Sequence, residues 1–141
     1  MSSDFDGHEP AAPQYAADGE SLEMDKDARL WGALAHLAAL SMFFTGVGFV
    51  LGPFIVWMLK RNDYPFVDWH GKESLNFQAS VFLYGVALGV LTFLTCGLGG
   101  FLAVPAAIVL GVADVVFVIL ASIAANDGRW YRYPLTIRIL K

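Results

Sequence analysis

Cysteine is almost absent from this sequence, because Cys96 is the only one among 141 residues. A single cysteine cannot form a disulfide within the chain, and it excludes a metal site built on several thiolates. Cys96 lies in a short connection between two apolar stretches. We interpret it as a small buried hydrophobic residue. A disulfide between two copies is the alternative.

Positive charge is missing from most of the chain. No Lys or Arg occurs over residues 30–59 or 73–128, and the connections around 45–48 and 95–100 carry no charge of either sign. The bases form three groups: Lys26 and Arg29, then Lys60, Arg61 and Lys72, and finally Arg129, Arg132, Arg138 and Lys141. A path with four membrane spans puts all nine on one side. Since cytoplasmic loops collect Lys and Arg, we expect a multi-pass protein of the cytoplasmic membrane with both termini inside.

Motifs of catalysis are also missing. The chain has no Gly-rich phosphate loop, no nucleophile beside a base and no paired carboxylates, so we expect neither an enzyme nor a cofactor. Asp68, His70 and Glu73 resemble metal ligands, but their spacing of two and three does not place them on one helical face. We expect no metal site there. A positive segment followed by an apolar run and a cleavage site is absent too, so no removable signal peptide is predicted.

Apolar residues dominate instead. Hydrophobic residues make up 57% of the chain and aromatic residues 14%, with a mean hydropathy of +0.56. This is too apolar for a soluble domain of this size. We predict an all-α integral membrane domain over residues 28–141, a four-helix bundle of two short helices followed by two long ones.

The first 27 residues differ in character from the rest. They carry eight acids and one base, a net charge of −7, whereas the remainder carries +3. The segment has Pro and Gly but no apolar periodicity, which is typical of disorder. We therefore predict a disordered acidic tail over residues 1–27.

The uncharged stretch 30–59 is longer than the roughly twenty residues that one span needs. It forms either one steeply tilted helix or two short ones. Gly46 and Gly48 supply the permissive residues of a tight reversal, so we favour helices over 28–44 and 47–60. Each would be only about 20 to 25 Å long. Such helices would thin the bilayer or fail to cross it completely.

The two long helices are predicted from Asp68, as the N-terminal cap, to Thr95, and from Phe101 to Ala125. Membrane helices pack through small residues spaced four apart. The chain offers such pairs on three helices, and we expect them at helix contacts: Gly48 and Gly52, Gly85 and Gly89, and Ala103, Ala107 and Gly111.

Asp114 is the one formal charge inside a predicted span. An ionised carboxylate there costs about 2.5 to 3.5 kcal/mol, so it should be protonated, paired or directed towards an interior cavity. Counting helical rise, His36 and Gln78 lie in the same half of the membrane. A cluster of His36, Gln78 and Asp114 would act as hydrogen-bonded glue between helices, which we favour, or as a proton or ion relay.

The segments next to the membrane carry an interfacial motif of charged and aromatic residues. Asp68, His70, Lys72 and Glu73 begin the third helix, and an ion pair between Asp68 and Lys72 is expected. The C-terminal segment, with Arg129, Arg132 and Tyr133, suits an anchor to anionic headgroups. Because it lies beside a membrane, we expect lipid as its partner and no nucleic acid.

Three motifs carry a family resemblance: FVDWHGKESLNFQ at residues 66–78, WGALAHL at 31–37 and YRYPL at 131–135. The chain resembles a family of small bacterial membrane proteins of unknown function, itself distantly similar to the twenty-kilodalton subunit of the chloroplast inner-envelope translocon. It departs from the family pattern at Trp69, where Glu is usual, and at Ser74, where Ala is usual. The resemblance covers residues 29–141. It implies a four-helix fold in the bacterial inner membrane and, weakly, a role near protein translocation.

Two functions follow from these observations. The first is a non-catalytic membrane component that associates with other membrane proteins or with itself, in protein insertion, translocation or envelope maintenance. The second is a small oligomeric channel or proton-coupled carrier that uses His36 and Asp114.

Overall fold

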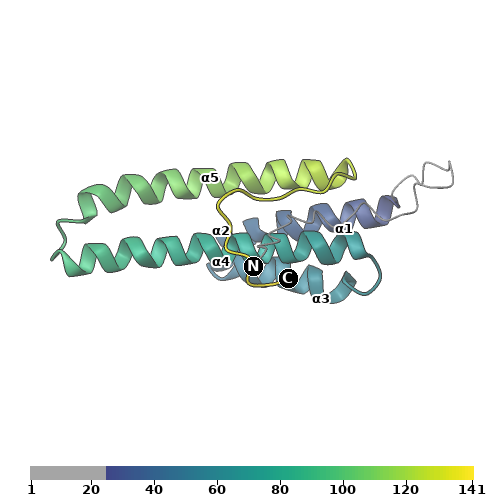
Figure 1. The fold of residues 1–141 in the computed structure, drawn as a ribbon, viewed down its shortest axis with the longest axis horizontal. Coiled ribbons are helices and arrows are strands. Elements are labelled where there is room, and N and C mark those ends of the chain that lie inside the picture. Colours follow the sequence, from purple (N-terminus) through teal and green to yellow (C-terminus); the bar gives the residue numbers. More distant parts are fainter. Residues whose placement is uncertain (1–24) are drawn as a thin grey trace, which may run out of the picture.

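The computed structural model describes residues 25–141, which form an α-helical fold closed by an extended C-terminal segment (Figure 1). The elements are α1 (Lys26–Leu37), the 3-10 turn η2 (Ala38–Ser41), α2 (Met42–Thr45), α3 (Gly48–Lys60), α4 (Pro65–Leu94) and α5 (Gly100–Asn126). Since α1, η2 and α2 follow one another directly, the described residues make four helical segments, as predicted. The predicted acidic tail lies outside the described residues except for residues 25–27.

The helix starts follow local chemistry. Asp25 caps α1 by accepting a hydrogen bond from the Asp27 amide at 3.0 Å, so this helix begins two residues before the predicted start. α4 begins at Pro65, where a missing N–H costs nothing, and extended Tyr64 precedes it. The prediction that Asp68 caps this helix is therefore wrong. Asp68 lies in the first turn of the helix instead.

Residues 26–60 fold back on themselves as two antiparallel helices, which we call the short hairpin. The reversal falls at Gly46, whose φ of 71° belongs to the region that favours glycine. A Cβ added to Gly52 would overlap the carbonyl of Ala38, and one added to Gly48 would overlap Ser41. The predicted reversal and the close approach at Gly48 and Gly52 are both present.

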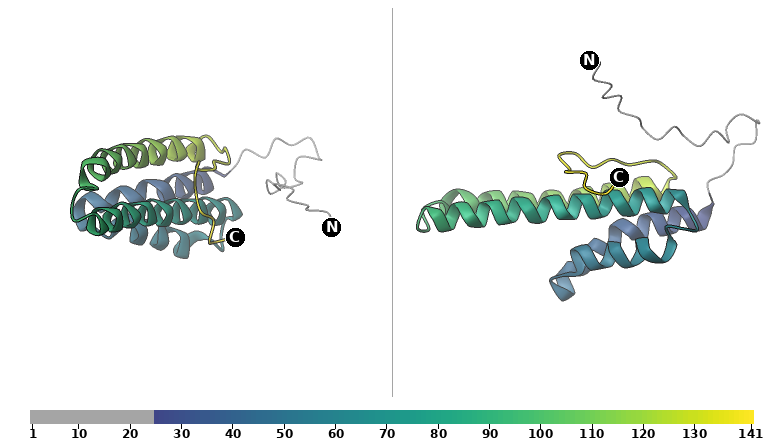
Figure 2. Two further views of the ribbon diagram at one scale, coloured as in Figure 1. Left: turned by 60° about the vertical axis from the view of Figure 1, so that its left-hand side comes forward. Right: turned by 60° about the horizontal axis from the view of Figure 1, so that its bottom comes forward.

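α4 and α5 form a second and much longer hairpin, which the short hairpin covers over only part of its length (Figure 2). Near the tip of the short hairpin, Phe49 of α3 stacks on Phe82 of α4, with ring centroids 6.0 Å apart. From Phe82, α4 continues for twelve residues to Leu94, or about 18 Å. We call this uncovered part of α4 and α5 the far half.

Small residues in the far half do not pack as predicted. A Cβ added to Gly85, Gly89 or Gly111 would meet no atom within 4 Å, and Ala107 is exposed. Only Ala103 is buried. The prediction fails because the short hairpin ends before it reaches these positions. Closer contacts occur at two glycines that the spacing rule missed, Gly71 against Trp57 and Gly32 against Phe66.

α4 and α5 are each long and apolar enough to cross a membrane, whereas α3 is apolar but shorter. The apolar surface of both helices is extensive, because large apolar side chains are exposed along them. The turn between them, residues 95–99, is also uncharged. Cys96 lies in this turn and is exposed, which corrects its interpretation as a buried residue.

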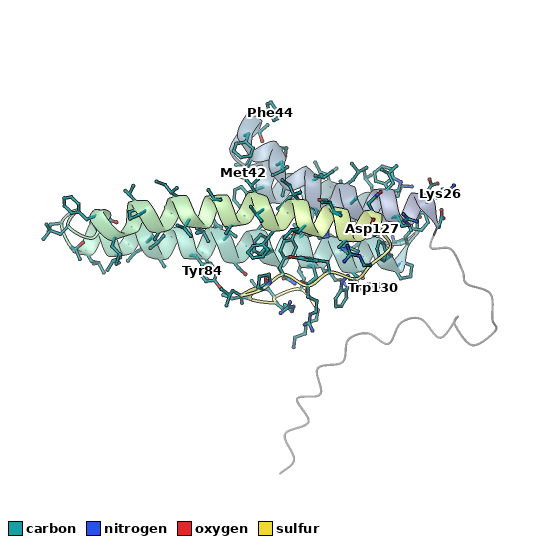
Figure 3. The ribbon with its side chains drawn as sticks, turned by 90° about the horizontal axis from the view of Figure 1, so that it is seen from above. Lys26, Met42, Phe44, Tyr84, Asp127 and Trp130 are labelled. Atoms are coloured by element: carbon teal, nitrogen blue, oxygen red, sulfur yellow. The ribbon has the colours of Figure 1, made fainter. Side chains whose placement is uncertain are left out.

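The opposite end of the molecule, which we call the charged end, gathers the bases and all four tryptophans. Lys60 lies over the ring of Trp31 at 5.3 Å and Arg61 over Trp57 at 4.6 Å. The rings of Trp69 and Trp130 meet edge to face at 5.7 Å. Figure 3 shows Lys26, Asp127 and Trp130 at this end, with Phe44 at the tip of the short hairpin farther along the molecule.

Candidate functional site: a polar chain beneath the C-terminal strap

Residues 127–141, which we call the strap, leave the end of α5 and run back over α4 (Figure 1). Four α4 side chains hold the strap, and their spacing of three or four residues puts them on one face of the helix: Glu73, Asn76, Ser80 and Tyr84. The strap backbone thus finds partners on a helix face that is polar within an otherwise apolar segment.

Glu73 makes the strongest of these contacts. Its carboxylate accepts hydrogen bonds from the Tyr133 amide at 3.2 Å and from Arg138 Nε at 2.8 Å. Glu73 is buried, while about a third of the Arg138 side chain stays exposed. The charge of Arg138 compensates a carboxylate that burial would otherwise disfavour. Arg138 is therefore paired within the molecule rather than with a headgroup.

Asn76 holds the last residues of the strap through three hydrogen bonds. Its Oδ1 accepts from the amides of Ile139 at 3.0 Å and Leu140 at 2.8 Å, and its Nδ2 donates to the Leu140 carbonyl at 2.8 Å. Farther along α4, Ser80 accepts from the Ile137 amide at 2.8 Å, and the Tyr84 hydroxyl donates to the Leu135 carbonyl at 2.6 Å. The prediction of a lipid anchor missed this docking.

A buried polar chain lies beneath the strap and links three parts of the fold. The Tyr133 hydroxyl is 2.9 Å from His36 Nδ1, and His36 Nε2 is 2.7 Å from His70 Nδ1. Both histidines are fully buried. A neutral imidazole offers one donor and one acceptor nitrogen, so the hydrogen bonds run in one direction along the chain. The chain fastens the strap to α1 and α4.

Tyr133 is the strap's contribution to this chain. It is buried, stacks on Phe77 with ring centroids 4.0 Å apart, and joins a core cluster with Ala39 and Val118. Burial raises the pKa of the Tyr133 hydroxyl well above its ordinary value. The hydroxyl therefore stays protonated and able to donate at any physiological pH.

The predicted cluster of His36, Gln78 and Asp114 is divided in the structure. Gln78 Nε2 donates to Asp114 Oδ1 at 2.8 Å, and both side chains are buried between α4 and α5. His36 instead bonds to His70 and Tyr133. The division arises because α1 packs against the first turns of α4, where His70 lies on the face turned towards it.

The interfacial motif is divided in the same way. Lys72 forms the predicted ion pair with Asp68 at 2.6 Å, and Trp57 Nε1 donates to the same carboxylate at 2.8 Å. His70 and Glu73 are buried rather than interfacial. Arg132, at 6.0 Å from the ring of Trp69, and Arg129 remain exposed.

The side chains of this site make hydrogen bonds that join the strap to α1 and α4. Within residues 25–141, no three His, Cys, Asp or Glu side chains gather to hold a metal ion. Most of the polar groups bond to one another or to the strap backbone, whereas the buried His70 Nε2 and Ser74 Oγ have no hydrogen-bond partner among the described residues. One signal in the sequence indicates this site: polar side chains at 73, 76, 80 and 84, spaced as one helical stripe through an apolar segment.

The fold and the site define a class: a small helical protein with an apolar hairpin of membrane-spanning length and a charged end closed by its own C-terminal strap. Residues 27–140 match the magnetosome magnetite crystal formation protein family (MamF/MmsF), and the chain belongs to this family. The resemblance to a family of small bacterial membrane proteins is confirmed at that level, whereas similarity to a chloroplast translocon subunit finds no support. No curated protein and no solved structure gives a significant match.

Proposed function

We propose that this protein is a non-catalytic integral component of the magnetosome membrane that supports magnetite crystal formation. The observation that carries the proposal is the far half of α4 and α5, which is uncharged and exposes large apolar side chains along its length. Such a surface is stable in hydrocarbon and unstable in water. The family match supplies the setting.

The distribution of charge supports an orientation. Because the described bases and all four tryptophans lie at one end, that end belongs at a membrane surface, and cytoplasmic loops are where Lys and Arg collect. The charged end then faces the cytoplasm, and the strap runs from this end along α4 as far as Tyr84. The turn at residues 95–99 faces the magnetosome interior.

An accessory role fits the chemistry better than a relay. Between Asp114 and the turn, and between Gln78 and the turn, the sequence contains no His, Asp, Glu, Lys or Arg. The polar groups therefore hold the charged end together and do not continue across the far half. The partners we propose are lipid and other membrane proteins or further copies of this chain.

Isolated magnetosomes provide the test, because their cytoplasmic face is outward. We expect the protein to resist extraction by alkaline carbonate. We also expect Cys96 to react with an impermeant thiol reagent only after detergent opens the membrane, with Cys96→Ser as the control for labelling. Release by carbonate would overturn integral insertion, and labelling of intact magnetosomes would overturn the orientation.

The role in crystal formation needs a separate measurement. Deleting the gene should change the size or number of magnetite crystals seen by electron microscopy, and the intact gene should restore them. Unchanged crystals would contradict the role while leaving membrane insertion in place.

A further inference from the structure

We propose that the molecule acts as a wedge that prefers a curved bilayer, with the charged end in the convex leaflet. The inference rests on the proposed insertion of the α4–α5 hairpin into a membrane. Its partner is a lipid surface of defined curvature. It is carried by the unequal lengths of the two hairpins (Figure 2).

The short hairpin reaches only about half of the depth that the long hairpin reaches. From Trp69, at the charged end, to Phe82, which Phe49 contacts near the tip of the short hairpin, α4 rises about 20 Å, and to Leu94 it rises about 38 Å. The hydrocarbon core is about 30 Å thick, and about 40 Å with its interfaces. The long hairpin therefore crosses, and the tip of the short hairpin stops inside the bilayer.

The tip of the short hairpin has the chemistry of a buried membrane segment. Phe43 is 67% exposed and Phe44 is 91% exposed, beside exposed Val47 and without any charge. The ends of α2 and α3 leave backbone groups that need partners, which water or headgroups drawn into the far leaflet would supply. Headgroups drawn inwards in this way make the far leaflet thinner beside the tip, but they do not increase the amount of protein in that leaflet.

The two leaflets consequently hold different amounts of protein. In the leaflet of the charged end stand α1, α3, α4 and α5, with the strap on the outside of α4. Beyond the point where Leu135 of the strap meets Tyr84, α4 and α5 are the only described elements in the opposite leaflet. The apolar side chains there face outward on both helices, and added Cβ atoms at Gly85, Gly89 and Gly111 meet open space.

The geometry of small vesicles shows when this difference matters. In a vesicle about 30 nm across with a bilayer about 40 Å thick, the outer surface exceeds the inner one by a factor of about 1.9. In a vesicle about 200 nm across the factor is only about 1.1. The molecule has four helices in one leaflet and two in the other, a ratio of about two. This ratio is close to the ratio of outer to inner surface in the small vesicle, so the more strongly curved bilayer fits the shape of the molecule.

The experiment reconstitutes the full-length protein, by removing detergent, into vesicles of phosphatidylethanolamine and phosphatidylglycerol of both sizes. An impermeant thiol reagent then reports orientation, because Cys96 lies in the turn of the far half. In the small vesicles we expect about four molecules in five to keep Cys96 inside, against a nearly even split in the large ones. The Cys96→Ser variant corrects for non-specific labelling.

Two further measurements distinguish the explanations. The difference between sizes should persist in about 1 M salt, where the Debye length falls to about 3 Å, since it depends on shape and not on headgroup charge. Equal orientation in both sizes, or a second copy cross-linked through Cys96 that fills the space beside the far half, would overturn the wedge. Protein that carbonate strips from both vesicle sizes would instead overturn membrane insertion itself.

Discussion

Asn76→Ala should release the end of the strap while leaving the rest of the fold in place. The substitution removes three hydrogen bonds, two accepted from the amides of Ile139 and Leu140 and one donated to the Leu140 carbonyl. Among the described residues, Asn76 makes the only hydrogen bonds to Ile139 and Leu140 at the end of the strap. Local opening, rather than global unfolding, is therefore the expected result.

The magnitude follows from the bonds and their exposure. Each hydrogen bond contributes about 0.5 to 1.5 kcal/mol net, so three contribute about 3 kcal/mol. The freed backbone can bind water, because both Ile139 and Leu140 are exposed, and this lowers the cost to about 2 kcal/mol. An opening equilibrium shifted by about 2 kcal/mol increases about thirtyfold.

Amide hydrogen exchange of the protein in detergent measures this shift. The amides of Ile139 and Leu140 should exchange about thirtyfold faster, whereas the Tyr133 amide, bonded to Glu73, should change much less. Asn126→Ala is the matched control, since Asn126 is exposed at the end of α5 and away from the strap contacts. Unchanged exchange at Ile139 and Leu140 in a folded Asn76→Ala protein would refute the docking of the strap.

Two further substitutions test contacts inside the bundle. Gly52→Val should lower the free energy of unfolding by about 3 kcal/mol or more, because its side chain would overlap the backbone of η2, while Gly85→Val enters open space and should stay within about 0.5 kcal/mol; equal thermal denaturation midpoints would contradict this assignment. Asp114→Leu should destabilise by about 1 to 3 kcal/mol, since it leaves the buried Gln78 amide unpaired, and Asp114→Asn should cost less. If Leu is tolerated as well as Asn in denaturation experiments, the pair does not stabilise the bundle.

Local signals in the sequence predict the helices well. The reversal at Gly46 and the two long apolar helices follow from glycine chemistry and from segment length, which depend on neighbouring residues alone. The predicted start of α4 is wrong because Pro65 and Asp68 are both valid start signals, and the proline comes first.

The contacts of the site were harder to predict, because they join residues far apart in the chain. A common depth in the membrane predicts that His36 lies near Asp114, yet depth alone does not say which helix faces which. Docking of the strap on α4 depends on backbone groups, whose partners no composition or motif reveals. The sequence shows the polar stripe of α4, but it does not show that the strap binds there.

The placement of the tryptophans has a practical consequence. Trp31, Trp57, Trp69 and Trp130 all belong to the charged end, each from a different helix or from the strap. Intrinsic tryptophan fluorescence of this protein therefore reports on one end only, because the far half contains no tryptophan. A shift in emission signals rearrangement of the short hairpin or the strap, and a bilayer-depth quencher reads the position of that end without any added label.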